Sequence, residues 1–93
     1  MPNIYYNGCR IYFWSNENDE PIHVHVTEGE VSKNSVKIFI RSNNTLDIDY
    51  CGYSIKKSTI DKAVDFINSN IMLIKTRWCE HFRVNFSDIK YKD

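Results

Sequence analysis

The chain has 93 residues, 42% of them apolar, with 12 Lys+Arg against 12 Asp+Glu. This composition fits one globular domain and disfavours disorder. Zero net charge also argues against a protein that holds nucleic acid mainly by electrostatics. The longest apolar runs have four residues, far short of the roughly 20 that cross a bilayer, and no leader pattern opens the chain. We therefore expect a single cytoplasmic domain, residues 1–93, with no membrane partner.

Residues 4–53 show the period of two that is typical of β-strands. Five segments rich in β-branched and aromatic residues are separated by polar sequences: Ile4–Tyr6, Arg10–Trp14, Ile22–Thr27, Val36–Ile40 and Thr45–Tyr50. The turn dipeptide Asn7-Gly8 favours a hairpin between the first two segments, and Ser42-Asn43-Asn44 separates the last two. These features predict an antiparallel sheet of four or five strands.

From Ser58 the apolar period changes to that of a helix. Ser58-x-x-Asp61 fits a broad form of the capping box. One apolar stripe then recurs at steps of three and four residues: Ile60, Val64, Ile67, Ile71, Ile74 and Trp78. Because Asn68-Ser69-Asn70 is a poor helix interior, we expect two helices or one kinked helix over 58–82, followed by a polar tail, 83–93. Strands followed by helices predict an α+β fold, with the helices covering one face of the sheet.

The opposite face of the sheet is predicted to carry polar side chains and to be open to water, because side chains alternate along a strand. His23 and His25 are its most informative members, since an H-x-H pair on a strand puts two imidazoles on one face, roughly 6–7 Å apart. Three interpretations stay open: solvated surface histidines, an acid–base pair that acts on phosphate, and two ligands of a metal ion. A structural role is a fourth, in which an imidazole bonds a neighbouring backbone group or contacts the Trp78–Phe82 end of the helix.

Other side chains on this face are candidates for binding. Four of them can hold phosphate or a partner, because cations pair with phosphate and aromatic rings stack: Arg10, Tyr12, Lys37 and Arg41. Asp47 and Asp49 also share the face, and we interpret them as solubilising charges that pair with a cross-strand cation. The glycines lie far apart along the chain, which excludes a Gly-rich nucleotide loop, and no cofactor is expected.

The cysteines bear on a weaker, metal-binding alternative. Cys9, Cys51 and Cys79 are odd in number and form no C-x-x-C pair, which indicates free thiols rather than disulfides or a zinc ribbon. A zinc site made by His23, His25 and Cys79 is chemically reasonable, and Cys51 and His81 are further candidate ligands. No ligand spacing supports it, so no metal is expected.

Several short motifs lie in a characteristic order along residues 8–82. Asp19–Val26 reads D-E-P-I-H-V-H-V, Ile11–Ser15 forms an aromatic lead-in, Gly52-Tyr53 precedes the helices, and Trp78–Phe82 reads W-C-E-H-F. Together they resemble a small bacterial family numbered 4160 among the domains of unknown function (DUF4160), with its D-E-P-P-H-V-H-V signature and closing W-H-E-Y-F pattern. Ile22 departs from the second proline. Cys79 stands where relatives often have histidine, which puts any role of that imidazole in doubt here.

The resemblance implies a context more than a chemistry. Members are commonly encoded beside a second small family (DUF2442), in the manner of a toxin and its antitoxin. The resemblance therefore implies a toxin-like protein with a DUF2442-like antitoxin partner and RNA as a target. By that analogy, His23 and His25 are the acid and base of a metal-independent cleavage, with Arg10, Lys37 or Arg41 holding phosphate.

Two functions follow as hypotheses. The first is a ribonuclease-like toxin that acts through the H-x-H pair and is neutralised by its antitoxin. The second is a non-catalytic protein-binding module, for example a small phage or mobile-element inhibitor, that docks a partner through its sheet face. A homodimer is a further arrangement that the sequence allows. Neutral charge favours the second function, and the family context favours the first.

Overall fold

The structure, a computed structural model, describes residues 3–6, 9–13, 20–28, 35–49 and 55–93. Over these residues the chain forms the following elements in order: β1 (Asn3–Tyr6), β2 (Cys9–Tyr12), β3 (His23–Glu28), β4 (Val36–Ile40), β5 (Leu46–Asp49), α1 (Lys57–Ser69), α2 (Ile71–Phe82) and the 3-10 helix η1 (Phe86–Asp88). Strands come first and helices last, so the predicted α+β class is confirmed. The predicted Asn7-Gly8 turn lies outside the described residues.

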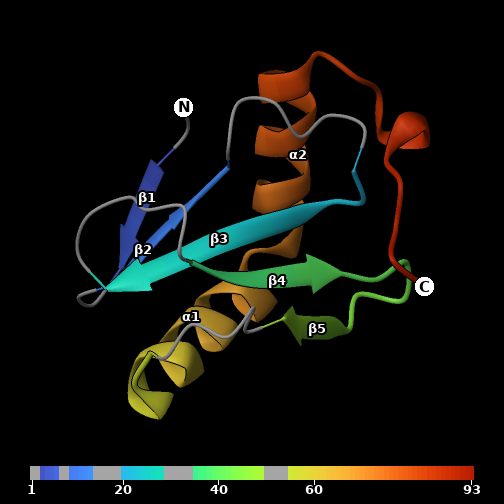
Figure 1. Ribbon diagram of the computed structural model, residues 1–93. Helices are drawn as coiled ribbons and strands as arrows, with labels where there is room; N and C mark the ends of the chain where they lie inside the picture. The colour runs from blue at the N-terminus through green and yellow to red at the C-terminus, as the bar shows by residue number, and fades with distance from the viewer. Residues whose placement is uncertain (1–2, 7–8, 14–19, 29–34, 50–54) are drawn as a thin grey trace.

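The strands form one antiparallel sheet in which each strand pairs with its neighbours in sequence, in the order β1-β2-β3-β4-β5. In Figure 1 α2 lies behind β3 and α1 lies below β3 and β4. Buried side chains of both helices pack in one core with those of the strands, so the helices cover one face of the sheet. In the described part of the chain, β1 and β5 form the two edges of the sheet. The predicted arrangement, a sheet with one face covered by two C-terminal helices, is confirmed.

The core lies between the sheet and the helices, where the predicted alternation places it. Ile11, Val24 and Ile38 come from three neighbouring strands and are each at most 1% exposed. From the helices, the apolar stripe supplies buried Ile60, Ile67, Ile74 and Trp78, while Val64 and Ile71 pack at the margin. Since full burial of an aliphatic side chain contributes about 1.5–3 kcal/mol, this layer fixes which sheet face turns inward.

The start of α1 differs from the prediction. The helix begins at Lys57 with Lys56 as its N-cap residue, and no side chain caps it. The capping box predicted at Ser58 is therefore wrong. The backbone carbonyl of Lys56 already accepts the N–H groups of Thr59 and Ile60, at 3.0 and 3.1 Å, so the helix starts two residues earlier than a Ser58 cap allows.

The break between the helices is confirmed. Helix α1 ends at Ser69 and α2 begins at Ile71, with Asn70 between them. The Asn70 side chain donates to the carbonyl of Phe66 at 2.8 Å, which satisfies a carbonyl of the last turn of α1. No helix in the described part of the chain is long and apolar enough to span a membrane.

The C-terminal segment, residues 83–93, runs back along α2 and ends near the β4–β5 turn (Figure 1). The sequence predicts a polar tail here, but Ile89 is 7% exposed and joins the core. The Ile22 amide donates to the Lys90 carbonyl at 2.9 Å. Asp93 accepts hydrogen bonds from the backbone N–H and Oγ of Ser42, at 3.0 and 2.6 Å. The segment thus fastens the start of β3 and the β4–β5 turn to the helical layer.

Candidate functional site

The polar side chains that the sequence assigns to one sheet face lie on alternate positions opposite the core, and the strand register orders them in rows. One row crosses four strands through Cα partners: Tyr12, His25, Lys37 and Asp49. On one side of it, Arg10 is opposite Thr27. On the other side, His23 is opposite Phe39. We call this surface, the sheet side opposite the apolar core, the polar face.

His23 and His25 lie close together but are not open to water. Their ring centroids are 5.0 Å apart, which confirms that the pair shares one face. The prediction that they are solvated is wrong, because their exposed fractions are 0% and 2%. Aromatic rings enclose them: Tyr12 stacks on His25 at 5.4 Å, and Phe39 and Trp78 lie 5.0 and 5.7 Å from His23.

The imidazole nitrogens are engaged inside the fold. His23 Nδ1 lies 2.8 Å from the carbonyl oxygen of Pro21. A carbonyl only accepts, so Nδ1 carries the proton and donates it. His23 Nε2 faces Glu20 Oε2 at 3.6 Å, and a proton there makes this contact an ion pair. His25 Nδ1 lies 2.7 Å from Ser35 Oγ, a buried hydrogen bond.

These contacts match the structural interpretation of the histidine pair. That interpretation expects an imidazole to bond a neighbouring backbone group or to contact the helix end, and His23 does both, through Pro21 and Trp78. The pair therefore ties the lead-in of β3, the start of β4 and helix α2 together. Only the rings' placement is established by these contacts, and catalysis stays a prediction.

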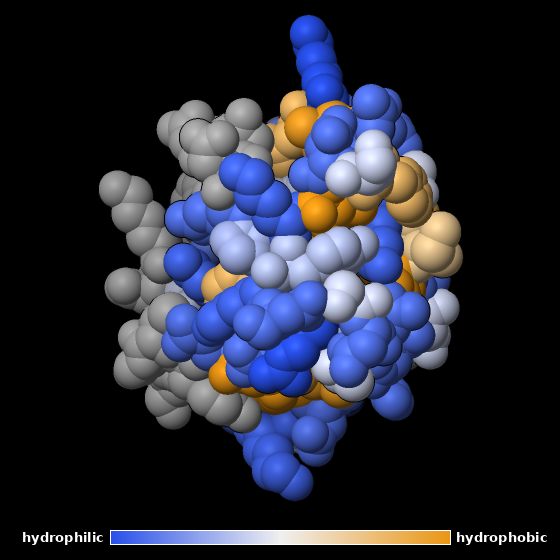
Figure 2. Space-filling view, turned by 90° about the vertical axis from the view of Figure 1, so that its right-hand side faces the viewer, coloured by the Kyte–Doolittle hydropathy of each residue, from blue (hydrophilic) through white to orange (hydrophobic). Residues whose placement is uncertain are grey.

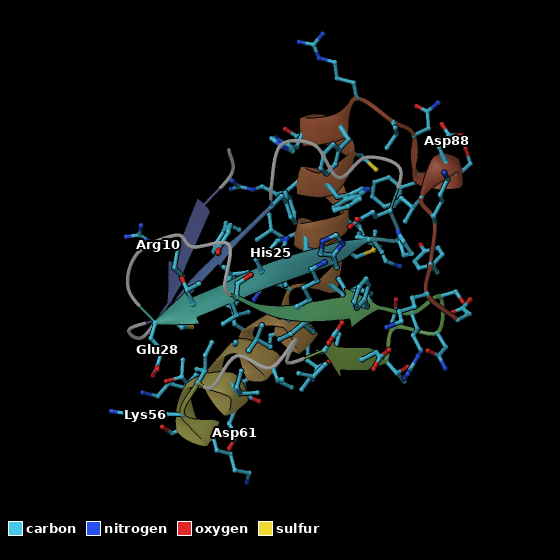
Figure 3. All side chains as sticks on the ribbon, viewed as in Figure 1. Arg10, His25, Glu28, Lys56, Asp61 and Asp88 are labelled. Atoms are coloured by element: carbon cyan, nitrogen blue, oxygen red, sulfur yellow. The ribbon has the colours of Figure 1, made fainter. Side chains whose placement is uncertain are left out.

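The four binding candidates fall in different settings. Tyr12 is 1% exposed and forms part of the floor of the polar face, not its surface. Arg10 and Lys37 are partly exposed from β2 and β4, and Arg10 and His25 project from neighbouring strands in Figure 3. Arg41 lies beyond the end of β4, and its guanidinium pairs with Asp47 at 3.5 Å. The register thus groups Arg10 and Lys37 around His25, while Arg41 belongs to the β4–β5 turn.

The charge pairing expected for the aspartates is confirmed for one of them. Asp47 binds Arg41 as predicted, and it also pairs with Lys92 of the C-terminal segment at 3.4 Å. The Lys92 ammonium lies 4.4 Å from the centre of the Phe39 ring, which itself contacts His23. The C-terminal segment therefore also covers the His23 end of the polar face.

The proposed metal ligands do not assemble. Within the ranges that the structure describes, no three His, Cys, Asp or Glu side chains lie close enough to share a metal ion, so His23, His25 and Cys79 form no such group. Cys51 lies outside these ranges. Burial raises the pKa of the Cys79 thiol, and burial does the same for Cys9, so both behave as small buried side chains.

Two members of the polar face were not singled out from the sequence. Thr27 is 1% exposed and follows His25 by two residues, so strand alternation alone puts it beside the pair. Ser35 is 3% exposed and bonds His25. It precedes Lys37 by two residues, so alternation puts it on the same face, but it lies one residue before the predicted strand Val36–Ile40.

The fold and this face define a small α+β domain whose H-x-H strand is enclosed by aromatic and hydroxyl side chains. A family model described as Domain of unknown function (DUF4160) matches residues 8–79. The match covers more than half of the chain, and the protein belongs to this family. Comparisons with curated proteins and with solved structures gave no match.

Proposed function

We propose that this domain is the toxin-like member of a toxin–antitoxin pair and that it acts by binding protein rather than by cleaving RNA. Family membership supports the pairing, through the antitoxin-like neighbour that the resemblance implies. The burial of His23 and His25, at 0% and 2% exposure, carries the non-catalytic part. A general acid or base must come within about 2.6–3.2 Å of the proton that it transfers, and enclosed imidazoles do not offer a nitrogen to a polymer.

The proposed docking surface is the outer edge of β5. All four of its residues, Leu46–Asp49, are partly exposed. The bond from the Arg41 amide to the Thr45 carbonyl, at 2.9 Å, sets the alternation of the β4–β5 ladder. Asp47 and Asp49 are then the residues that bond to β4, while the backbone groups of Leu46 and Ile48 point outward. A partner strand can pair with these outward groups, a common mode of peptide recognition.

The occupant is proposed to be a strand of the antitoxin-like partner rather than a second copy. Antiparallel pairing of two β5 strands would bring Asp47 and Asp49 of both copies onto one face, and like charges on facing strands are destabilising. The molecular face that includes the C-terminal segment is mostly hydrophilic, with only small separate apolar patches (Figure 2). Backbone pairing at an edge suits such a surface better than burial of a large apolar patch.

A matched pair of variants tests this docking mode. Ile48→Pro removes an N–H that points away from β4, whereas Ile48→Ala loses similar side-chain packing but keeps the N–H. Each variant is co-expressed with the tagged product of the neighbouring gene, and its growth effect is measured with and without that gene. We expect wild type and Ile48→Ala to be captured and neutralised, and Ile48→Pro to escape both. Equal capture of the two variants, or no growth effect of the wild type, would refute the proposal.

A ribonuclease is the second candidate, favoured by the row that aligns Tyr12, His25 and Lys37. It requires an opening motion that exposes the imidazole. His25→Gln is the useful test, because the amide can replace the hydrogen bond to Ser35. If this variant stays folded by thermal melt and loses both toxicity and RNA cleavage, the second candidate replaces the first. Full toxicity with intact RNA supports the binding mode.

A further inference from the structure

The polar face contains a buried hydroxyl to which the described residues offer no hydrogen bond. Thr27 is 1% exposed, and its Oγ1 has no hydrogen-bond partner within the part of the chain that the structure describes. Such groups are rare in native proteins because an unpaired buried hydroxyl is costly, and they often mark a bound water, an ion or a functional site. The neighbouring polar side chains, His25 and Ser35, are also buried and bond to each other. Thr27, His25 and Ser35 therefore form a buried polar layer, here called the polar floor, under the centre of this face.

Two cations flank this floor. Arg10 is the direct Cα partner of Thr27 on β2, and Lys37 is the direct partner of His25 on β4. Both are partly exposed. Arg10 and Lys37 lie two strands apart and are offset by two residues along the strands, so strand spacings of about 4.8 Å and a rise of about 3.3 Å per residue put them roughly 12 Å apart. Two long side chains can close this gap over Thr27. Asp49, on the next strand beyond Lys37, is the acidic residue in this row.

We propose that the centre of the polar face binds a small tetrahedral oxyanion, inorganic phosphate or a terminal phosphate group, between Arg10 and Lys37. The Thr27 hydroxyl donates to one anion oxygen, and the guanidinium and ammonium groups donate to others. Because the floor is buried and only the cations reach the surface, the site admits a small anion rather than a nucleic-acid strand. This site is separate from the β5 edge, so it does not depend on the proposed docking mode.

A phosphate titration followed by NMR tests the site. At constant ionic strength, inorganic phosphate should shift the wild-type amide signals of β2, β3 and β4 around Arg10, Thr27 and Lys37 in a saturable manner. Thr27→Val keeps the side-chain shape and removes only the hydroxyl, so it should fold as well as wild type and bind phosphate roughly 10-fold more weakly. Lys37→Gln should weaken binding as well. Lys57→Gln, a control on α1 whose side chain is 92% exposed, should leave the affinity unchanged.

Three outcomes would overturn the site: no saturable shift in wild type up to millimolar phosphate, unchanged affinity of Thr27→Val, or an equal loss in Lys57→Gln. The first would mean that the hydroxyl is satisfied by water alone. A second arm compares uridine 5′-monophosphate with inorganic phosphate, and both results support the site. Equal affinity identifies free phosphate as the ligand, and tighter binding identifies a nucleotide phosphate. Capture of the partner protein, measured on the same variants, reports separately on the docking proposal.

Discussion

The burial of His23 makes a strong prediction about stability. The ring is 0% exposed, contacts Phe39 and Trp78 at centroid distances of 5.0 and 5.7 Å, and donates to the Pro21 carbonyl at 2.8 Å. His23→Ala removes the hydrogen bond, a loss of about 1 kcal/mol. It also opens a cavity beside two aromatic rings, and we take about 2–3 kcal/mol for a ring smaller than phenylalanine. The expected loss is therefore about 3–4 kcal/mol of the free energy of unfolding.

That loss is large for a domain of this size. At roughly 0.05–0.15 kcal/mol per residue, the whole chain is expected to be stable by only about 5–14 kcal/mol. Urea denaturation of wild type and His23→Ala measures the difference, with the slope of the transition checked for equality. His81→Ala is the matched control, because His81 is only partly buried, meets Phe82 edge-on and lies tilted against Phe13 at a centroid distance of 6.0 Å.

For the control variant, His81→Ala, the free energy of unfolding should fall by about 1 kcal/mol or less. If His23 were solvated, its replacement by alanine would lower the free energy of unfolding by no more than about 0.5 kcal/mol. If His23→Ala unfolds within about 0.5 kcal/mol of wild type, or loses no more than His81→Ala, the enclosed ring and its bond to Pro21 are refuted. The non-catalytic proposal would then lose its main support.

Three further predictions concern groups that fasten the fold. Lys75 is 8% exposed and donates to Asn44 Oδ1 at 3.0 Å, so Lys75→Ala should lower the free energy of unfolding in urea by about 1.5–3 kcal/mol; a change near zero would contradict the contact. Hydrogen bonds from Ser42 lower the pKa of Asp93. A carboxyl group whose pKa falls on folding stabilises the folded protein at pH values above its ordinary pKa. That stabilisation is lost as the pH falls through the lowered pKa. The Tm difference between wild type and Asp93→Asn should therefore be present at neutral pH and shrink as the pH falls below the ordinary pKa of an aspartate, and a pH-independent difference would exclude this linkage. Burial raises the pKa of the Cys79 thiol. Iodoacetamide should therefore label the peptide that contains Cys79 slowly in the folded protein and rapidly in urea, as followed by mass spectrometry. Equal labelling rates would show that the thiol is not protected.

Most of the fold follows from the sequence because two hydrophobic periodicities, that of β-strands and that of α-helices, specify its elements and their buried faces. Alternation assigned Val24 to the core face and His25 to the other, and the helical stripe through Ile60 and Trp78 assigned the helices to the core side. Asn70 broke the helix as its weak propensity predicts. The error at Ser58 arose because a capping residue pattern marks a helix start only within a residue or two.

The candidate site was less predictable, because alternation gives the face of a side chain and not what covers it. His23 reads as a surface residue along β3, yet Trp78 reaches it from a helix 55 positions later in the chain, and Lys92 of the C-terminal segment covers its neighbour Phe39. Contacts so distant in sequence leave no periodic signal. The row of Tyr12, His25 and Lys37 also depends on strand register, which the long connections from β2 to β3 and from β3 to β4 do not fix in the way that a two-residue hairpin turn does.

The enclosure of the H-x-H strand has a physical reason that also constrains function. Burying an imidazole is costly unless its nitrogens are bonded, and the chain meets this cost locally: Pro21, two residues before His23, supplies a carbonyl, and Ser35, at the start of β4, supplies a hydroxyl. Each histidine thereby fixes a neighbouring segment relative to β3. Thr27, the next residue on the same face, has no such partner among the residues that the structure describes. If the H-x-H motif serves to hold these buried polar side chains in place, phosphate binding should depend on Thr27 and on the flanking Arg10 and Lys37. Phosphate binding should then persist in His25→Gln, which preserves the bond to Ser35.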